Sequence, residues 1–323
     1  MDNILVTGGA GYVGSHVCKA LAAAGYRPVV YDNLRHGHRQ AVRWGPLEEG
    51  EIEDQARLGE VIERYRPVGA LHFAALIQVG ESVTDPAKYY RNNAVGTLSL
   101  LEGLRAGGVQ RLVFSSTAAV YGTPDRIPID EDHPLRPINP YGATKLAVEW
   151  MLRDFGIAYG LGWAALRYFN AAGADPEGET GERHDPESHA LPLAIQAALG
   201  TGPAFNLFGT DYDTPDGTAV RDYIHVADLA SAHVLALRRL LDGGDSQALN
   251  LGTGIGTSVR TLLAAVERVG GRPVPAIERP RRAGDPPVLL ADPGRARRVL
   301  GWEAAYRQID DIVRTAWAWH ARG

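Results

Sequence analysis

Short apolar runs separated by longer amphipathic stretches give the chain its main pattern. The runs end in small or polar residues, as strands do where they enter a loop. A helix that contains residues 20–22 follows the first run. Strands alternating with helices predict an α/β fold with a Rossmann-type, doubly wound parallel sheet. The predicted strands are residues 4–7, 28–31, 70–75, 111–114, 166–169 and 248–251.

The second half of the chain differs from the first in its glycine- and proline-rich stretches. Glycine and proline gather at residues 175–186 and 211–217, where they predict loops. The length of 323 residues allows two domains with real cores. We therefore expect a smaller C-terminal α/β domain beside the Rossmann-type domain. The last stretch, Ile309–His320, predicts a packing helix because its apolar residues recur with a helical period: Ile312, Val313, Ala316 and Trp317.

Three glycines, Gly8, Gly11 and Gly14, stand between the first predicted strand and the helix after it. Glycines let a backbone approach a pyrophosphate, and the positive end of a helix favours its negative charge. The turn therefore predicts a dinucleotide site that includes Tyr12 and Val13.

Asp32 ends the second predicted strand. An acid about 20 residues after the glycines binds the adenosine ribose in such folds. A carboxylate there favours NAD over NADP because it would repel a 2′-phosphate. Nearby basic residues leave NADP open as the exception: Arg35, His36, His38 and Arg39.

Other residues at predicted strand ends are weaker candidates. Glu51 could face the adenine or be an ordinary exposed glutamate. The small residues that close the stretch 70–75 suit a backbone passing under a phosphate or the nicotinamide ribose. His72 in that stretch is expected to be a core histidine rather than a catalyst. Asn93 is the asparagine that we expect at the cofactor, among eight in the chain.

Tyr141 and Lys145 are four residues apart, so on a helix they share one face. The pKa of an unperturbed tyrosine is about 10, and a neighbouring ammonium must favour the phenolate before Tyr141 can take a hydroxyl proton near neutrality. The chain has only three lysines and thirty arginines, which favours a specific role for Lys145. Thr117, just after the strand 111–114, is expected to be the third catalytic residue.

Composition and charge exclude several classes of protein. The net charge is −5 and the chain has no basic cluster, which argues against nucleic acid as a partner. The one cysteine, Cys18, excludes an internal disulfide and is expected to be a small buried residue, and we expect no metal site. The first strand starts at Asn3 and no apolar run reaches about 20 residues, so we expect no signal peptide, no membrane segment and a cytoplasmic location.

Taken together, these motifs resemble those of the extended short-chain dehydrogenase/reductase family. Further stretches sharpen the resemblance to the UDP-glucose 4-epimerase family, also called UDP-galactose 4-epimerases, and the match runs from Ile4 to about Trp319. The run Arg221-Asp-Tyr-Ile-His-Val226 is the most family-specific piece. The others are residues 79–82, 166–170, 216–218 and 250–254.

The resemblance implies a reaction. In that family the tyrosine takes the proton of the sugar 4-hydroxyl while a hydride passes from C4 to bound NAD. The transient 4-keto sugar then turns over and receives the hydride on its other face. The positive nicotinamide would join Lys145 in lowering the pKa of Tyr141. The binding energy should lie on the UDP half, because the sugar must turn.

The resemblance also implies two sets of contacts. Cofactor contacts are expected at Gly8, Gly11, Tyr12, Val13, Gly14, Asp32, Asn33, Glu51, Ile52, Phe73, Ala74, Ala75, Asn93, Ser115, Tyr141, Lys145 and Phe169. Substrate contacts are expected at Thr117, Tyr141, Asn170, His189, Asn206, Leu207, Phe208, Arg221, Tyr223, Arg282, Asp285 and Leu289. Among the latter, Arg221 and Arg282 match ligands of the diphosphate, for which planar guanidinium groups are suited.

The predicted domains follow from this assignment. Residues 1–170 form the NAD-binding Rossmann domain, to which residues 222–254 return. Residues 171–221 and 255–323 form the UDP-sugar-binding domain. A homodimer is common in the family and is expected here.

Three positions depart from the family pattern. Many members have an aspartate where Glu51 stands and a lysine where Gln78 stands, which puts those cofactor contacts in doubt. Members that accept only hexoses usually have a tyrosine where Leu289 stands, and members that take N-acetylated sugars have something smaller. Leu289 is intermediate and predicts some room for an N-acetyl group.

Other functions remain open at this point. A nucleotide-sugar 4,6-dehydratase would need a carboxylate acid/base pair where this chain has Ala118 and Ala119. A 4-epimerase of another UDP-sugar, such as UDP-N-acetylglucosamine, UDP-glucuronate or UDP-xylose, is the closest alternative. A non-catalytic NAD-sensing module is the alternative of a different class, and it would be expected to lose Tyr141 or Lys145.

Overall fold

A computed structural model describes residues 1–282 and 285–322. The chain forms two compact units. The first contains residues 1–122, 134–167 and 230–249, and the second contains residues 123–133, 168–229 and the described residues of 250–323.

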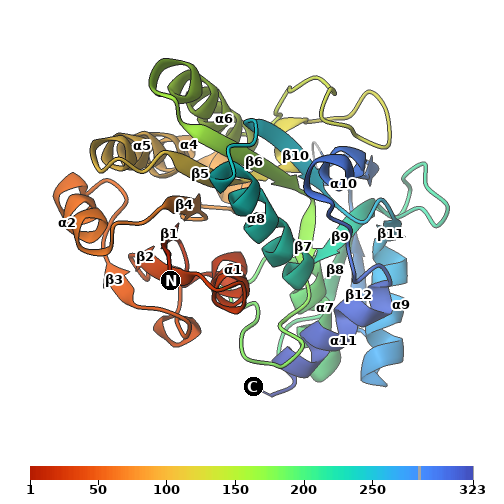
Figure 1. The fold of residues 1–323 in the computed structure, drawn as a ribbon. Coiled ribbons are helices and arrows are strands. Elements are labelled where there is room, and N and C mark those ends of the chain that lie inside the picture. The colour runs from red at the N-terminus through yellow and green to blue at the C-terminus, as the bar shows by residue number, and fades with distance from the viewer. Residues whose placement is uncertain (283–284, 323) are drawn as a thin grey trace. The chain divides into compact units, whose positions relative to one another are not determined.

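The first unit is built on a seven-stranded sheet with the order β10-β6-β5-β4-β1-β2-β3 (Figure 1). Read from the other end, the first six strands have the usual order of a Rossmann-type fold. The pairs that β1 makes with β2 and β4, β2 with β3, and β4 with β5 are parallel. The predicted α/β class is therefore confirmed. The strands are β1 (Asn3–Thr7), β2 (Arg27–Asp32), β3 (Leu47–Glu49), β4 (Gly69–His72), β5 (Arg111–Thr117), β6 (Gly162–Tyr168) and β10 (Gln247–Leu251).

Helices cover both faces of this sheet. On one face, α2 (Gln55–Tyr65), α5 (Gly96–Ala106) and α6 (Pro140–Tyr159) bury a core of aliphatic side chains against the strands. On the other face lie α1 (Tyr12–Ala23) and the part of α8 (Val226–Leu241) that belongs to this unit (Figure 1). Because helices cover both faces of the sheet, side chains on both sides of each strand are buried. This is why the strands appear in the sequence as continuous apolar runs. Shorter elements are η1 (Arg39–Ala41), α3 (Val79–Thr84), α4 (Pro86–Tyr89), the π-helix η2 (Tyr90–Val95) and η3 (Ala118–Val120).

The second unit has a four-stranded sheet centred on β9 (Val220–His225). Its other strands are β7 (Asn170–Ala172), β11 (Gly256–Ser258) and β13 (Val288–Leu289). A separate parallel pair joins β8 (Phe205–Phe208) to β12 (Ala276–Arg279). The helices are α7 (Ala190–Leu199), α9 (Val259–Gly270), α10 (Gly294–Leu300) and α11 (Ile309–His320).

The C-terminal helix α11 has the predicted bounds, and its packing role is confirmed. Ile312, Val313 and Ala316 are buried in the core that α11 shares with α7 and α9. The ring of Trp317 lies so close to Gly270 that a Cβ atom there would be 2.3 Å from it. Glycine is thus required where α9 meets this tryptophan.

The domain boundaries predicted from the sequence stay a prediction. The compact units differ from them in the segments 123–133, 168–170, 222–229 and 250–254, all of which lie in the second unit. Within residues 1–282 and 285–322, no helix is both long enough and apolar enough to cross a membrane.

Candidate active site

The glycine turn between β1 and α1 has the geometry of a phosphate cradle. Gly8 has a φ of +74°, and a Cβ atom on it would lie 2.5 Å from the backbone nitrogen of Ala74. A Cβ atom on Gly14 would lie 2.3 Å from the Gly8 oxygen, whereas one on Gly11 would meet only that oxygen, at 3.3 Å. Gly8 and Gly14 therefore allow the tight turn and the close helix, and Gly11 leaves space for a ligand at the start of α1, where Tyr12 and Val13 lie.

Asp32 lies at the end of β2 beside this turn. Its carboxylate accepts hydrogen bonds from the backbone nitrogens of Ala10, at 3.0 Å, and Leu34, at 2.9 Å. Burial raises the pKa of Asp32. The hydrogen bond from Ala10 thus links the glycine turn to Asp32. The remaining lone pairs of the Asp32 carboxylate are suited to accept hydrogen bonds from ribose hydroxyls. A NAD adenosine fits these residues.

Glu51 and Ile52 follow β3 (Leu47–Glu49) after one intervening residue, Gly50. The Glu51 carboxylate accepts a 2.9 Å hydrogen bond from the Asn33 side chain and forms a 2.9 Å ion pair with Arg35. Ile52 is buried against Gly96 at the start of α5. The structure therefore brings Asn33 and Glu51 together at the end of β2. Gln78 lies at the N-terminus of α3, and its side chain makes no capping hydrogen bond there.

The strand predicted at residues 70–75 is shorter than expected, because β4 ends at His72. Phe73, Ala74 and Ala75 form a loop beside the glycine turn. Asn93 holds the loop in place, since its side chain accepts from the Leu76 nitrogen at 2.8 Å and donates to the Leu76 oxygen at 2.9 Å. The Phe73 nitrogen still donates to the Thr7 oxygen of β1, at 2.8 Å, and the Asn93 side chain takes over from the sheet ladder further on.

Asn93 belongs to the π-helix η2, a feature often found at functional sites. Its side chain also approaches Thr144 of α6, at 3.3 Å. Asn93 thus positions the loop next to the predicted cofactor site. A direct contact between Asn93 and the cofactor stays a prediction.

His72 has the predicted role of a core residue. Its Nδ1 atom is 2.6 Å from the Thr7 hydroxyl and its Nε2 atom is 2.8 Å from the Thr97 hydroxyl. Burial, with a smaller effect from Lys145, lowers the pKa of His72 to about 3. Cys18 is also buried, as predicted, and burial raises its pKa.

Tyr141 and Lys145 lie in the first two turns of α6. The helix begins at Pro140, and the side chain of Asn139 caps it by accepting from the Gly142 nitrogen at 2.8 Å. The Lys145 ammonium is buried, donates a 2.8 Å hydrogen bond to the Ser115 oxygen, and lies 6.0 Å from the centre of the Tyr141 ring. The predicted pair is thus assembled, with Lys145 held between α6 and the end of β5.

Two opposing effects act on the pKa of Lys145. Burial lowers the pKa of Lys145 to about 7, and the Glu149 carboxylate, one turn further along α6, opposes this effect. The ammonium also lies 4.8 Å from the centre of the Phe114 ring, whose face favours a cation. Proton transfer near neutrality is therefore within reach of this lysine.

A buried polar network that the sequence did not reveal lies behind Lys145. Glu149 accepts a 2.5 Å hydrogen bond from the Ser116 hydroxyl and a 2.9 Å bond from Arg167 Nε. Arg167 also donates to the Tyr121 hydroxyl at 3.0 Å. The side chains of Glu149 and Arg167 are 6% and 5% exposed, so their charges are paired almost without water. The network holds in place the Glu149 carboxylate, which raises the pKa of Lys145 against the effect of burial.

Thr117 is the last residue of β5. Its hydroxyl accepts a 3.1 Å hydrogen bond from the Ala119 nitrogen and so caps η3. The Ala119 oxygen in turn packs against Gly142, where a Cβ atom would be 2.6 Å away. These contacts hold the strand end that carries Ser115 and Thr117 against the first turn of α6.

In the second unit, β9 collects four of the predicted substrate contacts on one face. Arg221 and Tyr223 are two residues apart on β9, so they point to the same side. Leu289 of β13 is paired with Arg221, and Asn170 of β7 is paired with Tyr223. The guanidinium of Arg221 also forms an ion pair with Asp285.

The opposite side of β9 has a structural role. Asp222 is buried and accepts hydrogen bonds from the nitrogens of Thr253, Gly254 and Ala291, at 2.8, 3.0 and 3.2 Å. Burial raises the pKa of Asp222. The family-specific run on β9 thus contains two kinds of residue. Arg221 and Tyr223 are candidate substrate contacts, and Asp222 holds the neighbouring segments in place through hydrogen bonds.

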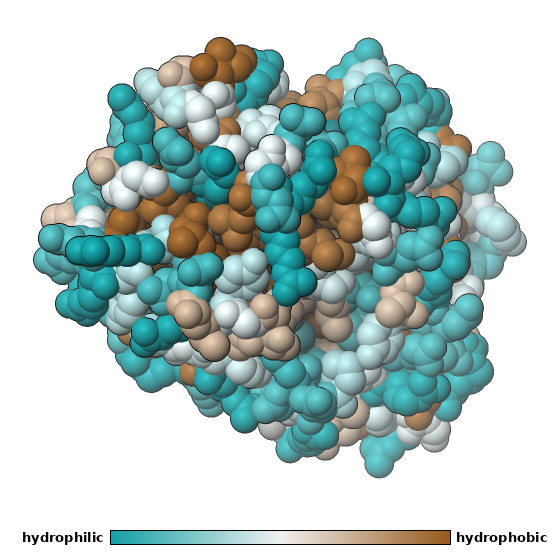
Figure 2. Space-filling view, in the orientation of Figure 1, coloured by the Kyte–Doolittle hydropathy of each residue, from teal (hydrophilic) through white to brown (hydrophobic). Residues whose placement is uncertain are grey.

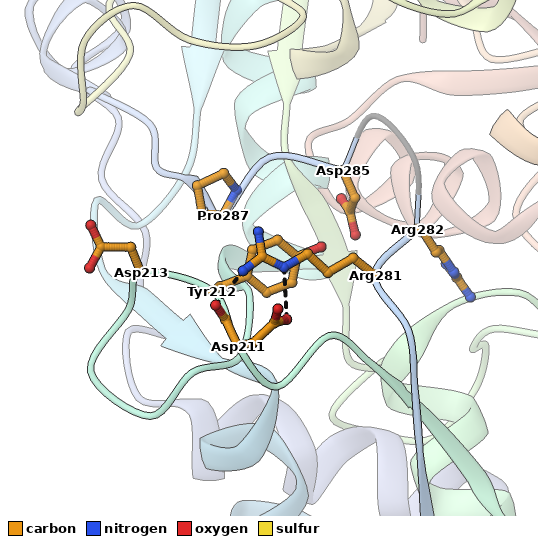
Figure 3. A pocket seen from close by; sticks show the side chains of 7 residues that line it. All are labelled: Asp211, Tyr212, Asp213, Arg281, Arg282, Asp285 and Pro287. Atoms are coloured by element: carbon orange, nitrogen blue, oxygen red, sulfur yellow. Dashed lines mark hydrogen bonds and ion pairs between the residues drawn. The ribbon is translucent and has the colours of Figure 1, made fainter.

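A pocket of about 820 Å³ opens beside Arg282 and Asp285 (Figure 3). Arg281 in this pocket is bound to Asp211 at 2.7 Å and lies over the Tyr212 ring. The guanidinium of Arg282 lies 3.9 Å from the centre of the Phe208 ring. The sequence did not single out Arg281 or Asp211.

The other predicted substrate residues are more scattered. Asn206 and Leu207 lie on β8 with Phe208, and Asn206 accepts a 2.9 Å hydrogen bond from Arg279. Phe169 lies between β6 and β7. His189 stands at the N-terminus of α7 and contacts Glu182. Burial opposes a charge on His189, but Glu182 outweighs it, so the pKa of His189 is raised.

Comparison with known proteins identifies this arrangement. The model of the NAD dependent epimerase/dehydratase family matches residues 4–252, and the chain belongs to that family. The UDP-glucose 4-epimerase of Rhizobium meliloti (strain 1021) is 58% identical over 99% of this chain and 98% of its own length. The resemblance inferred from the motifs is thus confirmed.

Solved structures agree. The structure of UDP-glucose 4-epimerase from Brucella ovis in complex with NAD has a TM-score of 0.97 and 56% identity, over 98% of each chain. The UDP-Glc/GlcNAc 4-epimerase from Campylobacter jejuni has a TM-score of 0.87 and 38% identity, over the whole of both chains.

Proposed function

We infer that this protein is an isomerase of the UDP-glucose 4-epimerase type (EC 5.1.3.2), which inverts C4 of UDP-glucose and UDP-galactose through a transient 4-keto sugar, with NAD as its cofactor. The observation that carries the assignment is the buried Lys145 ammonium, held by the Ser115 oxygen beside Tyr141. The same unit contains the glycine turn and Asp32, which suit NAD. This combination supplies a base and a dinucleotide site together.

The chain's own groups perform the proton transfer. Tyr141 takes the proton of the sugar 4-hydroxyl, and the positive charge of Lys145 stabilises the phenolate that Tyr141 needs. The Thr117 hydroxyl binds the sugar oxygen and orients it for the transfer. Bound NAD supplies the hydride acceptor and donor at its nicotinamide. The reverse proton transfer from Tyr141 completes the inversion.

Residues of the second unit are proposed to bind the UDP half of the substrate. Arg221 and Arg282 are proposed to bind the diphosphate, because planar guanidinium groups pair well with phosphoryl oxygens. Asp285 already pairs with Arg221 and would help to orient it. Binding energy placed there leaves the sugar able to turn between the two half-reactions.

A specific residue favours a second substrate. Leu289 lies beside Arg221 in the sheet and is smaller than the tyrosine expected in hexose-only relatives. We propose that UDP-N-acetylglucosamine is also turned over, at a rate within about a hundredfold of UDP-glucose. The similarity to the Campylobacter UDP-Glc/GlcNAc enzyme supports this proposal. A slower rate than that would rule it out.

We also propose a homodimer. Large apolar side chains are exposed on elements of the first unit, including Val95, Leu98, Trp150 and Ile157. Trp150 and Ile157 are two turns apart on the same side of α6. Figure 2 shows hydrophobic residues reaching an otherwise hydrophilic surface. A sedimentation measurement tests the dimer, and the cytoplasmic location stays a prediction from the sequence.

The experiment that tests the function uses the purified protein without added cofactor. It is incubated with UDP-galactose, and the sugar is followed by proton NMR. Formation of UDP-glucose is expected, because NAD should remain bound during purification. No conversion, even after NAD is added, would move the substrate to a uronate or pentose, or the protein to a binding role.

A further inference from the structure

Four side chains, among them the predicted substrate contact His189, bring their ligand atoms together just before α7. Glu182, His184, Glu187 and His189 come from one stretch with the spacing E-x-H-x-x-E-x-H. The Nδ1 or Nε2 atoms of the histidines and the carboxylate oxygens that face each other all lie within 4.8 Å. We propose that this cluster is a structural binding site for a divalent metal ion of the zinc class. The sequence alone had suggested no metal site.

The separations fit ligands around an ion. The Nδ1 atom of His184 is 3.0 Å from Glu182 Oε1 and 3.8 Å from Glu187 Oε1. The Nδ1 atom of His189 is 3.7 Å from the same Glu187 oxygen. The two longer distances exceed those of hydrogen bonds. Ligands bound tetrahedrally at zinc distances lie roughly 3.4 Å apart, within the range of these three separations. His189 and Glu182 are in closer contact through a hydrogen bond, which must open when an ion binds.

Burial and charge point the same way. The side chains of Glu182 and Glu187 are 2% and 6% exposed and that of His184 is 18% exposed, whereas that of His189 is 42% exposed. Two carboxylates buried this far need a counter-charge of two, which the two histidines supply when both are protonated. A divalent ion that replaces the Nδ1 protons of two histidines supplies it, with two neutral imidazoles and two carboxylates as a tetrahedral set.

Contacts behind the ligands hold them in place. The Glu187 Oε1 atom accepts from the backbone nitrogens of Ser188, at 2.7 Å, and His189, at 2.9 Å. The Trp319 indole donates a 3.0 Å hydrogen bond to the Glu182 backbone oxygen. The same indole packs on Gly181, where a Cβ atom would be 2.4 Å away. An ion here would therefore fasten the segment before α7 to α11.

The mixed donor set selects the kind of ion. Imidazole nitrogens suit zinc and its first-row neighbours, whereas magnesium and calcium prefer oxygen ligands alone. The site has no part in the hydride chemistry, so its test does not depend on turnover. A failure of the epimerisation assay would leave the metal result intact, and the reverse holds as well.

The test measures metal content and thermal stability of the full-length protein. After chelator treatment, one zinc ion per chain should rebind, and a hundredfold excess over Kd should raise Tm by about 5 °C. Cobalt should give the visible absorption of a four-coordinate ion. His184→Ala should lose both the zinc and the Tm response. Glu177→Gln, in the separate acidic group Asp175, Glu177 and Glu179, is the matched control and should keep both.

Two results would overturn the proposal. One is a native protein that binds well under one zinc ion per chain and shows no change in Tm. The other is a His184→Ala variant that responds to zinc as the native protein does. In either case the cluster is an ion-pair network of protonated histidines and carboxylates. If His184→Ala does not fold, the cobalt spectrum of the native protein decides, since its absence contradicts the site.

Discussion

The ammonium of Lys145 donates a hydrogen bond of 2.8 Å to the backbone oxygen of Ser115. This bond joins α6 to the end of β5, so the strand that carries Thr117 also sets the position of the lysine next to Tyr141. The position is buried, and the ammonium is stabilised there by the Ser115 oxygen, the Phe114 ring and the Glu149 charge. The environment of Lys145 therefore leads to predictions on pH.

The stability of the NAD-free protein should depend on the titration of Lys145. Burial lowers its pKa from 10.5 to about 7 in the folded chain. Between these pH values the unfolded chain binds more protons, so the free energy of unfolding rises with pH. Relative to Lys145→Met, the native protein should gain a few kcal/mol between pH 7 and pH 10. Urea unfolding at both pH values measures this, and a constant difference would contradict the prediction.

Glu149 should act on catalysis through Lys145. Its carboxylate opposes the effect of burial, so Glu149→Gln should lower the pKa of Lys145 further. The alkaline limb of the kcat profile should then move to lower pH, because the ammonium is lost earlier. The variant should also lose about 3–5 kcal/mol of stability, since Arg167 would keep its charge without a carboxylate.

Ser116→Ala is the matched control for Glu149. It removes the 2.5 Å hydrogen bond to Glu149 but leaves the carboxylate charge in place. Its pH profile should stay where the native profile lies. Superimposable profiles for Glu149→Gln and the native protein would reduce the role of Glu149 to packing and pairing alone.

The glycine turn should tolerate no side chain at Gly14. In Gly14→Ala the new Cβ atom would lie 2.3 Å from the Gly8 oxygen, so the turn must open and the NAD cradle is lost. We expect at least a tenfold loss of NAD affinity by calorimetry and a loss of about 1–3 kcal/mol in stability. Gly59→Ala in α2 meets nothing within 4 Å and should gain up to about 1 kcal/mol with unchanged NAD binding. Equal NAD affinity in Gly14→Ala and Gly59→Ala would contradict the prediction that the glycine turn binds NAD.

Leu289 should set the sugar range. In Leu289→Tyr the larger ring should take the space of an N-acetyl group, so kcat/KM for UDP-N-acetylglucosamine should fall roughly tenfold or more relative to UDP-glucose. Leu289→Met, which keeps the volume, should leave the ratio of the two substrates unchanged. An equal loss for both sugars in Leu289→Tyr would show that Leu289 does not face the N-acetyl position.

Local patterns in the sequence predicted much of the fold and the centre of the site. The strand, glycine turn and helix at the N-terminus are contiguous, and Tyr141 and Lys145 lie one helical turn apart, so spacing alone brings them together. The helix α11 follows from a regular apolar period formed by Ile312, Val313, Ala316 and Trp317. These features depend on neighbours in the chain.

Features that depend on distant neighbours escaped prediction. Glu149 and Arg167 are 18 residues apart on α6 and β6 and look like ordinary charges in the sequence. Asp222 receives its backbone donors from segments as far away as Ala291. The glutamates and histidines around His189 lie in a stretch without period, where no spacing rule indicates which side chains converge. Only packing brings such groups together.

The central claim is that hydrogen leaves C4 of the sugar and returns to the same carbon, with Tyr141 moving the hydroxyl proton. Incubation of UDP-glucose deuterated at C4 with the native protein and with Tyr141→Phe, followed by NMR, tests it most directly. The native protein should give UDP-galactose that retains deuterium at C4, and Tyr141→Phe should be slower by a factor of about 10²–10⁴. Replacement of the deuterium by solvent hydrogen, or an unimpaired Tyr141→Phe, would contradict the account.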